Sequence, residues 1–158
     1  MTRTSHVSDR RPFLTRGGKT LDFTAMGFGS APLGNYLRKL SEEDCDRTVS
    51  TAWESGMRYF DTAPFYGLGL SEMRVGRVLA KHRRESYILS TKVGRVLTPC
   101  AKDEVNGVFF VQTPQLRWDY DYSYDGVMRS YEESLKRLRL DRVDILYVHD
   151  ICAFAHGG

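Results

Sequence analysis

Four side chains that can hold charge or move a proton follow predicted strands of this chain. Asp61 ends one apolar run and Tyr66 follows it closely. Lys92 ends the next apolar run, and His149 ends a later one. Because the carboxyl ends of parallel strands meet at one edge of an α/β sheet or barrel, we expect the carboxylate, phenol, ammonium and imidazole to lie close together.

These four groups could together interconvert a carbonyl and an alcohol. An ammonium beside a phenol favours the phenolate, so Lys92 would make Tyr66 a better partner for proton transfer. Asp61 would keep Lys92 charged and oriented, and His149 could add a hydrogen bond to the oxygen where charge develops. A phenol supported in this way is a general acid or base, with the proton moving at oxygen while a hydride moves at carbon. The hydride must come from a cofactor.

An alternation of short apolar runs with amphipathic stretches predicts successive βα units and a parallel sheet. We expect parallel strands, neighbours in chain order, near 26–30, 57–61, 87–92 and 143–148. The predicted helices are 42–55 with Ser41 as its cap, a second capped by Ser71, and a third from near Asp125 with Val127, Tyr131, Leu135 and Leu138 as its buried face. Such a pattern is typical of an α/β fold.

Two segments fall outside this alternation. The Gly-Gly pair at 17–18 lies between short strand-like runs and predicts a tight hairpin before the first parallel strand. The segment 95–124 is far longer than a usual connection of about 4–6 residues, and it is rich in aromatic residues. We expect it to hold a short hairpin of its own. Its aromatic rings could cover a site or serve packing only.

The composition is that of an ordinary folded protein. The chain has 158 residues, 41% hydrophobic and 27% charged, with a net charge of +3. Basic residues are spread along the chain, so nucleic-acid binding has no electrostatic support. No apolar run is long enough to span a bilayer, and the N-terminal stretch lacks the apolar block of a secretory signal, so we predict a cytoplasmic protein with no membrane partner. Cys45, Cys100 and Cys152 are too far apart for a C-x-x-C metal site.

Several of these segments together resemble the aldo-keto reductase superfamily, over about residues 13–156. They are Met26–Ser30, Tyr59–Gly67, Glu72–Gly76, Ser90–Lys92 and Asp144–His149. Within the superfamily, Gly94–Cys100 and Asp119–Ser130 most resemble the branch of aldose 1-dehydrogenases, such as L-fucose and D-threo-aldose dehydrogenases, and pyridoxal 4-dehydrogenases.

The resemblance implies a TIM barrel, (β/α)₈, and NAD or NADP as cofactor. It implies that Tyr66 transfers the proton, that Asp61 and Lys92 tune it, and that His149 orients the substrate oxygen of a sugar or aldehyde. Gly29 and Ser30, with Asp61, match positions near the nicotinamide, and no metal is implied. We expect a flexible tail at 1–12 and, at 13–158, the amino-terminal half of the barrel, truncated after the fourth strand. Half of the cofactor contacts would then be missing.

Other interpretations stay open. The chain could be a non-catalytic half-barrel that pairs with another half or with itself, or a complete small α/β binding module. A Rossmann fingerprint is rejected, because Pro32 stands where Gly27-x-Gly29 needs its third glycine. Glu72 and Asp150 are assigned to solvent or to a helix start, since no metal-ligand spacing joins them to a histidine.

Overall fold

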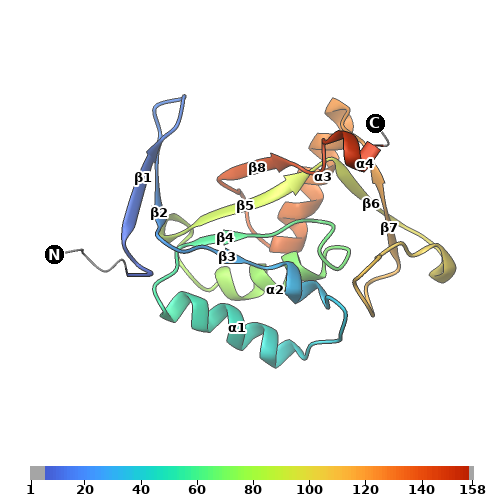
Figure 1. Ribbon diagram of the computed structural model, residues 1–158, viewed down its shortest axis with the longest axis horizontal. Coiled ribbons are helices and arrows are strands. Elements are labelled where there is room, and N and C mark those ends of the chain that lie inside the picture. Colours follow the sequence, from blue (N-terminus) through green and yellow to red (C-terminus); the bar gives the residue numbers. More distant parts are fainter. Residues whose placement is uncertain (1–5, 157–158) are drawn as a thin grey trace.

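The centre of the molecule is a four-stranded parallel sheet. The computed structural model describes residues 6–156. The strands β3 (Phe28–Gly29), β4 (Tyr59–Asp61), β5 (Ile88–Val93) and β8 (Ile145–Val148) lie in the order β3-β4-β5-β8, each pair parallel (Figure 1). The predicted parallel neighbours in chain order are therefore confirmed, although β3 is much shorter than expected.

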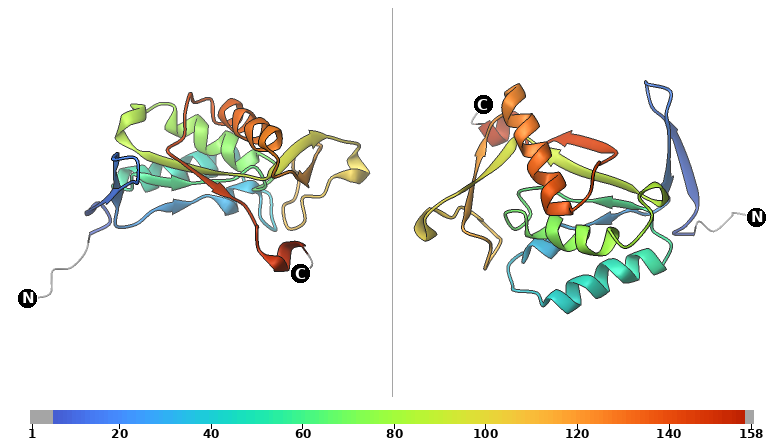
Figure 2. Two further views of the ribbon diagram at one scale, coloured as in Figure 1. Left: turned by 90° about the horizontal axis from the view of Figure 1, so that it is seen from above. Right: turned by 180° about the vertical axis from the view of Figure 1, so that it is seen from behind.

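Three helices cover one face of this sheet. They are α1 (Glu42–Glu54), α2 (Leu70–Leu79) and α3 (Tyr124–Leu138), and they lie on the same side when the sheet is seen edge-on (Figure 2). The core between helices and sheet is apolar, with Phe60 and Leu89 of the sheet fully buried against Val49, Val75 and Leu138. The opposite face carries no helix in the part of the chain that the structure describes.

The helix starts follow the capping rules, with one exception. The Ser41 hydroxyl accepts from the Asp44 backbone N–H at 3.0 Å, as predicted, and three acids follow in the first turn of α1. The predicted Ser71 cap of α2 is wrong. The N-cap is Gly69 at φ 89°, and Ser71 lies inside the helix, fully buried. The chain enters α2 through a turn that needs a left-handed residue, which glycine adopts without strain.

Helix α3 presents its small side chains to the interior. Gly126, Ser130 and Ser134 are buried. Of the expected apolar stripe, Leu138 is fully buried as predicted, whereas Val127, Tyr131 and Leu135 are only half-buried. The helix begins after Ser123, whose hydroxyl accepts from the Gly126 N–H at 3.1 Å. Small residues on the inner face let α3 approach its neighbours closely.

The closest of these approaches is between α2 and the end of α3, and Gly76→Ala tests it. A Cβ at Gly76 would lie 2.1 Å from the backbone oxygen of Leu138. We expect a lower Tm, because overpacking costs about 1–3 kcal/mol and exceeds the gain of about 1 kcal/mol from helix propensity. Gly17→Ala is the matched control, since a Cβ there meets nothing within 4 Å. An unchanged or higher Tm for Gly76→Ala would contradict the close packing.

Two antiparallel hairpins lie at opposite ends of the strands (Figure 1). The first, β1 (Arg10–Leu14) with β2 (Thr20–Thr24), lies at the amino-terminal ends and confirms the predicted hairpin. It begins before residue 13, so the ordered structure reaches into the predicted tail, of which residues 1–5 lie outside the described residues. The second, β6 (Arg95–Pro99) with β7 (Leu116–Tyr120), is the hairpin predicted within 95–124. It is followed along the chain by α3, and the short α4 (Ala153–His156) lies near it.

Across residues 6–156, no helix combines the length and the apolar character that a membrane span needs. The three cysteines are free thiols, Cys45 buried, Cys100 half-buried and Cys152 exposed.

Candidate active site

An ion pair joins two adjacent strands at the centre of the site. Lys92 Nζ lies 2.7 Å from Asp61 Oδ2 and donates a second hydrogen bond to the Thr62 carbonyl at 2.9 Å. The other carboxylate oxygen of Asp61 accepts from the Ser90 hydroxyl at 2.6 Å. Asp61 is paired with Ser90 in the parallel register, and Lys92 lies on the same face because side chains alternate along a strand. The side chains are 25% and 14% exposed, so the pair borders the solvent without lying in it.

Tyr66 lies in the turn between β4 and α2, directly beside this pair. The Lys92 ammonium is 4.8 Å from the centre of the Tyr66 ring. The turn is fixed by a close approach of two glycines, since a Cβ at Gly67 would lie 2.3 Å from the Gly34 carbonyl oxygen. Gly67 has φ 67°, which glycine adopts readily. The Tyr66 ring is therefore held beside the ammonium by a turn in which a side chain larger than glycine at position 67 would clash with the backbone.

His149 completes the group from the end of β8. Its backbone N–H donates to the Val93 carbonyl at 2.9 Å, and its ring meets the Tyr66 ring edge-on with centres 6.0 Å apart. The imidazole Nε2 is 3.5 Å from Asp150 Oδ2, while Nδ1 is buried with no partner among the described residues. Burial lowers the pKa of His149 to about 4, against the opposing pull of Asp150. At neutral pH the imidazole is therefore uncharged.

A second row of polar groups lies on the same face of the sheet, the one that α1, α2 and α3 do not cover, nearer the amino-terminal ends of the strands. The Tyr59 hydroxyl is 3.1 Å from Ser90 Oγ and 3.4 Å from the Tyr147 hydroxyl. Burial raises the pKa of Tyr59 to about 12, so this phenol stays protonated. The sequence analysis missed Tyr59, Ser90 and Tyr147. They could have been found from their spacing. Each precedes Asp61, Lys92 or His149 by two residues, and residues two apart on a strand lie on the same face of the sheet.

The two residues expected near a nicotinamide differ in what their side chains do. Gly29 is exposed at the end of β3, and a Cβ there would meet nothing within 4 Å. Ser30 is fully buried, and its hydroxyl donates to the Asp61 carbonyl at 2.7 Å and lies 2.8 Å from the Ser71 hydroxyl. The Ser30 side chain therefore holds the strand ends together. Of the three residues expected to contact the cofactor, Gly29 and Asp61 are accessible to a ligand, whereas Ser30 is buried.

Glu72 and Asp150 were assigned to solvent or a helix start. Glu72 does lie in the first turn of α2, but neither carboxylate is simply solvated. Glu72 is fully buried, with Arg137 Nε at 2.6 Å and Thr91 Oγ1 at 2.7 Å from its two carboxylate oxygens. Asp150 pairs with the buried Arg95, with Nη2 at 2.5 Å. In each case the partner comes from a segment distant in the sequence, so no local spacing could reveal it.

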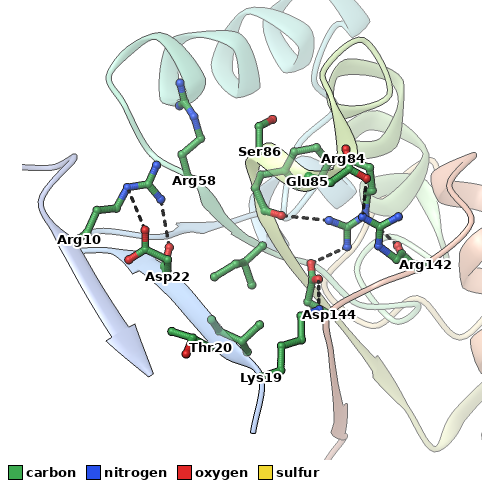
Figure 3. Close-up of a pocket in the computed structure, with 13 residues that line it drawn as sticks. Arg10, Lys19, Thr20, Asp22, Arg58, Arg84, Glu85, Ser86, Arg142 and Asp144 are labelled. Atoms are coloured by element: carbon green, nitrogen blue, oxygen red, sulfur yellow. Dashed lines mark hydrogen bonds and ion pairs between the residues drawn. The ribbon is translucent and has the colours of Figure 1, made fainter. Parts of the chain in front are cut away.

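One cavity lies away from this group. It has a volume of about 470 Å³ and lies at the amino-terminal ends of the strands, beside the β1–β2 hairpin (Figure 3). Its charged lining is largely neutralised by ion pairs, including Arg84 with Asp144 and Arg142 with Glu85. Within residues 6–156 there is no cluster of His, Cys, Asp or Glu that could hold a metal ion. The chemistry-bearing residues are therefore those at the carboxyl ends.

The comparison with known families agrees with this arrangement. A sequence model described as "Aldo/keto reductase family" matches residues 25–153, a span that contains all four polar strand-end residues. The chain belongs to the aldo/keto reductase family. It is 42% identical to a D-threo-aldose 1-dehydrogenase of Pseudomonas sp over 91% of its length, and 40% identical to a pyridoxal 4-dehydrogenase of Microbacterium luteolum over 95%. It spans only 44% and 45% of the length of these two relatives.

The fold likewise matches part of a longer solved structure. The aldo/keto reductase chain superposes on the holo form of an aldo-keto reductase from Bacillus halodurans with a TM-score of 0.68 and 29% identity, covering 89% of this chain and 40% of that one. The parallel sheet and its three covering helices are thus part of a (β/α)₈ barrel, which corresponds to the predicted half-barrel. The uncovered sheet face is the face that lies inside such a barrel.

Proposed function

We propose that this aldo/keto reductase chain carries the proton-transfer residues of an NAD(P)-dependent oxidoreductase that interconverts an aldehyde or hemiacetal with an alcohol or lactone. The observation that carries the proposal is the Lys92–Asp61 ion pair at 2.7 Å set against the Tyr66 ring. The name of the relative at 42% identity, a D-threo-aldose 1-dehydrogenase, supports an aldose as the substrate class. Within that class we propose an L-fucose-like aldose.

In the oxidation direction Tyr66 would accept the proton of the substrate hydroxyl as the carbon–oxygen double bond forms. Lys92, hydrogen-bonded to Asp61, would place its positive charge beside the phenol that accepts this proton. The neutral His149 orients the substrate oxygen by a hydrogen bond without adding a second cation. A bound NAD(P), for which Gly29 and Asp61 offer the accessible surface, supplies the hydride acceptor at carbon.

Aldose oxidation by the purified chain tests the proposal. The assay follows absorbance of the reduced nicotinamide with a panel of aldoses and with NAD or NADP. It is run on the 158-residue chain alone and after addition of the segment that completes the barrel of a relative. Turnover in either mixture that depends on this chain supports the proposal. Absence of turnover in both, with each partner folded, would contradict it.

The chain alone should bind NAD(P) weakly. Gly29 and Asp61 can contact only the nicotinamide end of the cofactor. The charged residues around the cavity of about 470 Å³ lie at the opposite ends of the strands, away from these two residues. Titration calorimetry with NAD and with NADP should show no saturation in the micromolar range. Micromolar affinity would contradict this expectation and would require a phosphate site on this half.

A structural role is the second candidate. Leu146, Tyr147 and Val148 of the edge strand β8 are 42%, 44% and 50% exposed, and an uncovered edge strand favours pairing with another strand. The chain would then act as a half-barrel that associates with another half or with itself. A monomer by size-exclusion chromatography at high protein concentration would exclude self-association.

A further inference from the structure

Arg95 joins the three segments that carry the candidate active site. It begins β6, separated by Gly94 from β5, the strand that carries Lys92, and it is only 8% exposed. Its guanidinium carbon lies 4.0 Å from the centre of the Phe65 ring and 3.9 Å from the Trp118 ring. Phe65 is the neighbour of Tyr66, and Trp118 belongs to the β6–β7 hairpin. The cation is therefore enclosed by aromatic rings from two loops at the site.

The polar end of Arg95 holds the residue that follows His149. Nε and Nη2 lie 2.9 and 2.5 Å from Asp150 Oδ2. The same oxygen is 3.5 Å from His149 Nε2, so one carboxylate oxygen lies between the guanidinium and the imidazole. Asp150 is also fixed by its backbone, since it has φ 54° and its carbonyl lies 2.8 Å from His156 Nε2. The carboxylate has little freedom to turn away.

This arrangement decides which imidazole nitrogen carries the proton. Nε2 faces a carboxylate oxygen, which accepts hydrogen bonds, whereas Nδ1 is buried without a partner among the described residues. Among the groups that the structure describes, Nδ1 is unpaired in either tautomer. A proton on Nδ1 would leave the lone pair of Nε2 facing the negatively charged Oδ2, whereas a proton on Nε2 faces an acceptor. The neutral form with its proton on Nε2 is therefore the favoured tautomer.

Burial is the main reason why the imidazole is neutral, and Arg95 acts in the same direction. The charged groups that act on His149 are Asp150 and Asp61, which favour its protonation, and Arg95 and Lys92, which oppose it. A bare Asp150 beside a buried imidazole would draw a proton onto it. The guanidinium offsets that carboxylate, so the imidazole beside the Tyr66 ring stays neutral.

We propose that Arg95 is a positioning residue that, through Asp150, keeps the His149 imidazole neutral, protonated on Nε2 and fixed in orientation beside Tyr66. The catalytic role of Arg95 rests on the proposed function. Its effect on the tautomer and charge of His149 does not depend on that function. A neutral, oriented imidazole offers the substrate oxygen one defined donor, Nε2–H, over the whole working pH range. The 3.5 Å contact of Nε2 with Asp150 Oδ2 is longer than an ordinary hydrogen bond, so this donor can bind a substrate oxygen. Loss of Arg95 would make that hydrogen bond depend on pH.

Nuclear magnetic resonance of the imidazole nitrogens tests the proposal without any need for turnover. The 158-residue chain is labelled with ¹⁵N-histidine, and His149 is assigned with His149→Gln. In the unaltered chain His149 should show the Nε2–H tautomer and should stay neutral down to about pH 4. Arg95→Met should move its titration up toward the ordinary value of 6.5, because Asp150 then acts unopposed.

Two further variants keep the test decisive. Arg117→Met is the matched control, because Arg117 lies on the same hairpin in an exposed pair with Asp119, at 43% and 51% exposure. It should leave the His149 signals unchanged. Asp150→Asn leaves the aromatic enclosure of Arg95 intact and should abolish the preference for Nε2–H. This variant tests the proposal if Arg95→Met does not fold. Unchanged titration in a folded Arg95→Met, or an unchanged tautomer in Asp150→Asn, overturns the proposal.

The same variants separate this inference from the proposed function. If the nitrogen signals behave as expected and no preparation oxidises an aldose, the positioning role stands and the proposed function fails. If turnover is found, Arg95→Met should add an ionisation to the acid side of the kcat profile that Arg117→Met lacks. Turnover with an unaltered pH profile in Arg95→Met, together with unchanged nitrogen signals, would remove the positioning role and leave the proposed function intact.

Discussion

Replacing Tyr66 by phenylalanine is expected to lower kcat by about 10²- to 10⁴-fold, the usual contribution of a general acid or base. The substitution removes only the phenol oxygen and keeps the ring, which contacts the Lys92 ammonium at 4.8 Å and the His149 ring at 6.0 Å. Cofactor affinity and fold should therefore change little. The measurement is kcat and KM for aldose oxidation, with this chain alone or joined to the segment that completes the barrel.

Tyr124→Phe provides the control for the loss of a phenol oxygen. Tyr124 begins α3 and is 79% exposed, so its substitution should leave kcat unchanged. If Tyr66→Phe kept more than about a tenth of the parental rate, well inside the expected loss, Tyr66 would not be the proton-transfer residue. His149 would then become the leading candidate, and its neutral state at working pH would make it a base in the oxidation direction.

The strand ends of the candidate site could be predicted because they depend on local pattern. Asp61 and Lys92 each end a short apolar run, and the parallel βα pattern puts such ends at one edge. The two-residue period also places Ser90 beside Asp61, although this contact was not anticipated. Local sequence thus determines which face and which end a strand residue occupies, and the neighbouring strand determines which side chain it meets.

The parts that could not be predicted depend on close approaches between distant segments. An apolar stripe on α3 suggested that Val127, Tyr131 and Leu135 face the core, but the helix lies so close to its neighbours that Gly126 and Ser130 do so instead. The cap of α2 was assigned to Ser71 by residue type, whereas Gly69 takes that position because the turn needs a left-handed residue. Hydropathy records the preference of a side chain for the interior, not the space available there.

The contact hardest to foresee is also the one whose removal should cost the most stability. Arg137 of α3 reaches the fully buried Glu72 of α2, with Nε 2.6 Å from Oε2. Gly69 leaves the room for this, since a Cβ there would lie 2.5 Å from Arg137 Cδ. Removing one partner of a buried pair leaves an uncompensated charge and typically costs about 3–5 kcal/mol. Arg137→Met should therefore lower the free energy of unfolding by that amount, measured by urea denaturation followed through tryptophan fluorescence.

Two variants identify the uncompensated carboxylate as the cause. Adding Glu72→Gln to Arg137→Met removes the charge and should recover more than half of the lost free energy, because the amide can still accept from Thr91. Arg117→Met breaks an exposed pair and should cost no more than about 1 kcal/mol. A loss below about 1 kcal/mol in Arg137→Met would show that the pair contributes no more than an exposed one. Glu72 accepts a hydrogen bond from Thr91, the neighbour of Lys92. A change in the Arg137–Glu72 pair would therefore also disturb β5, the strand that carries the ammonium of the candidate site.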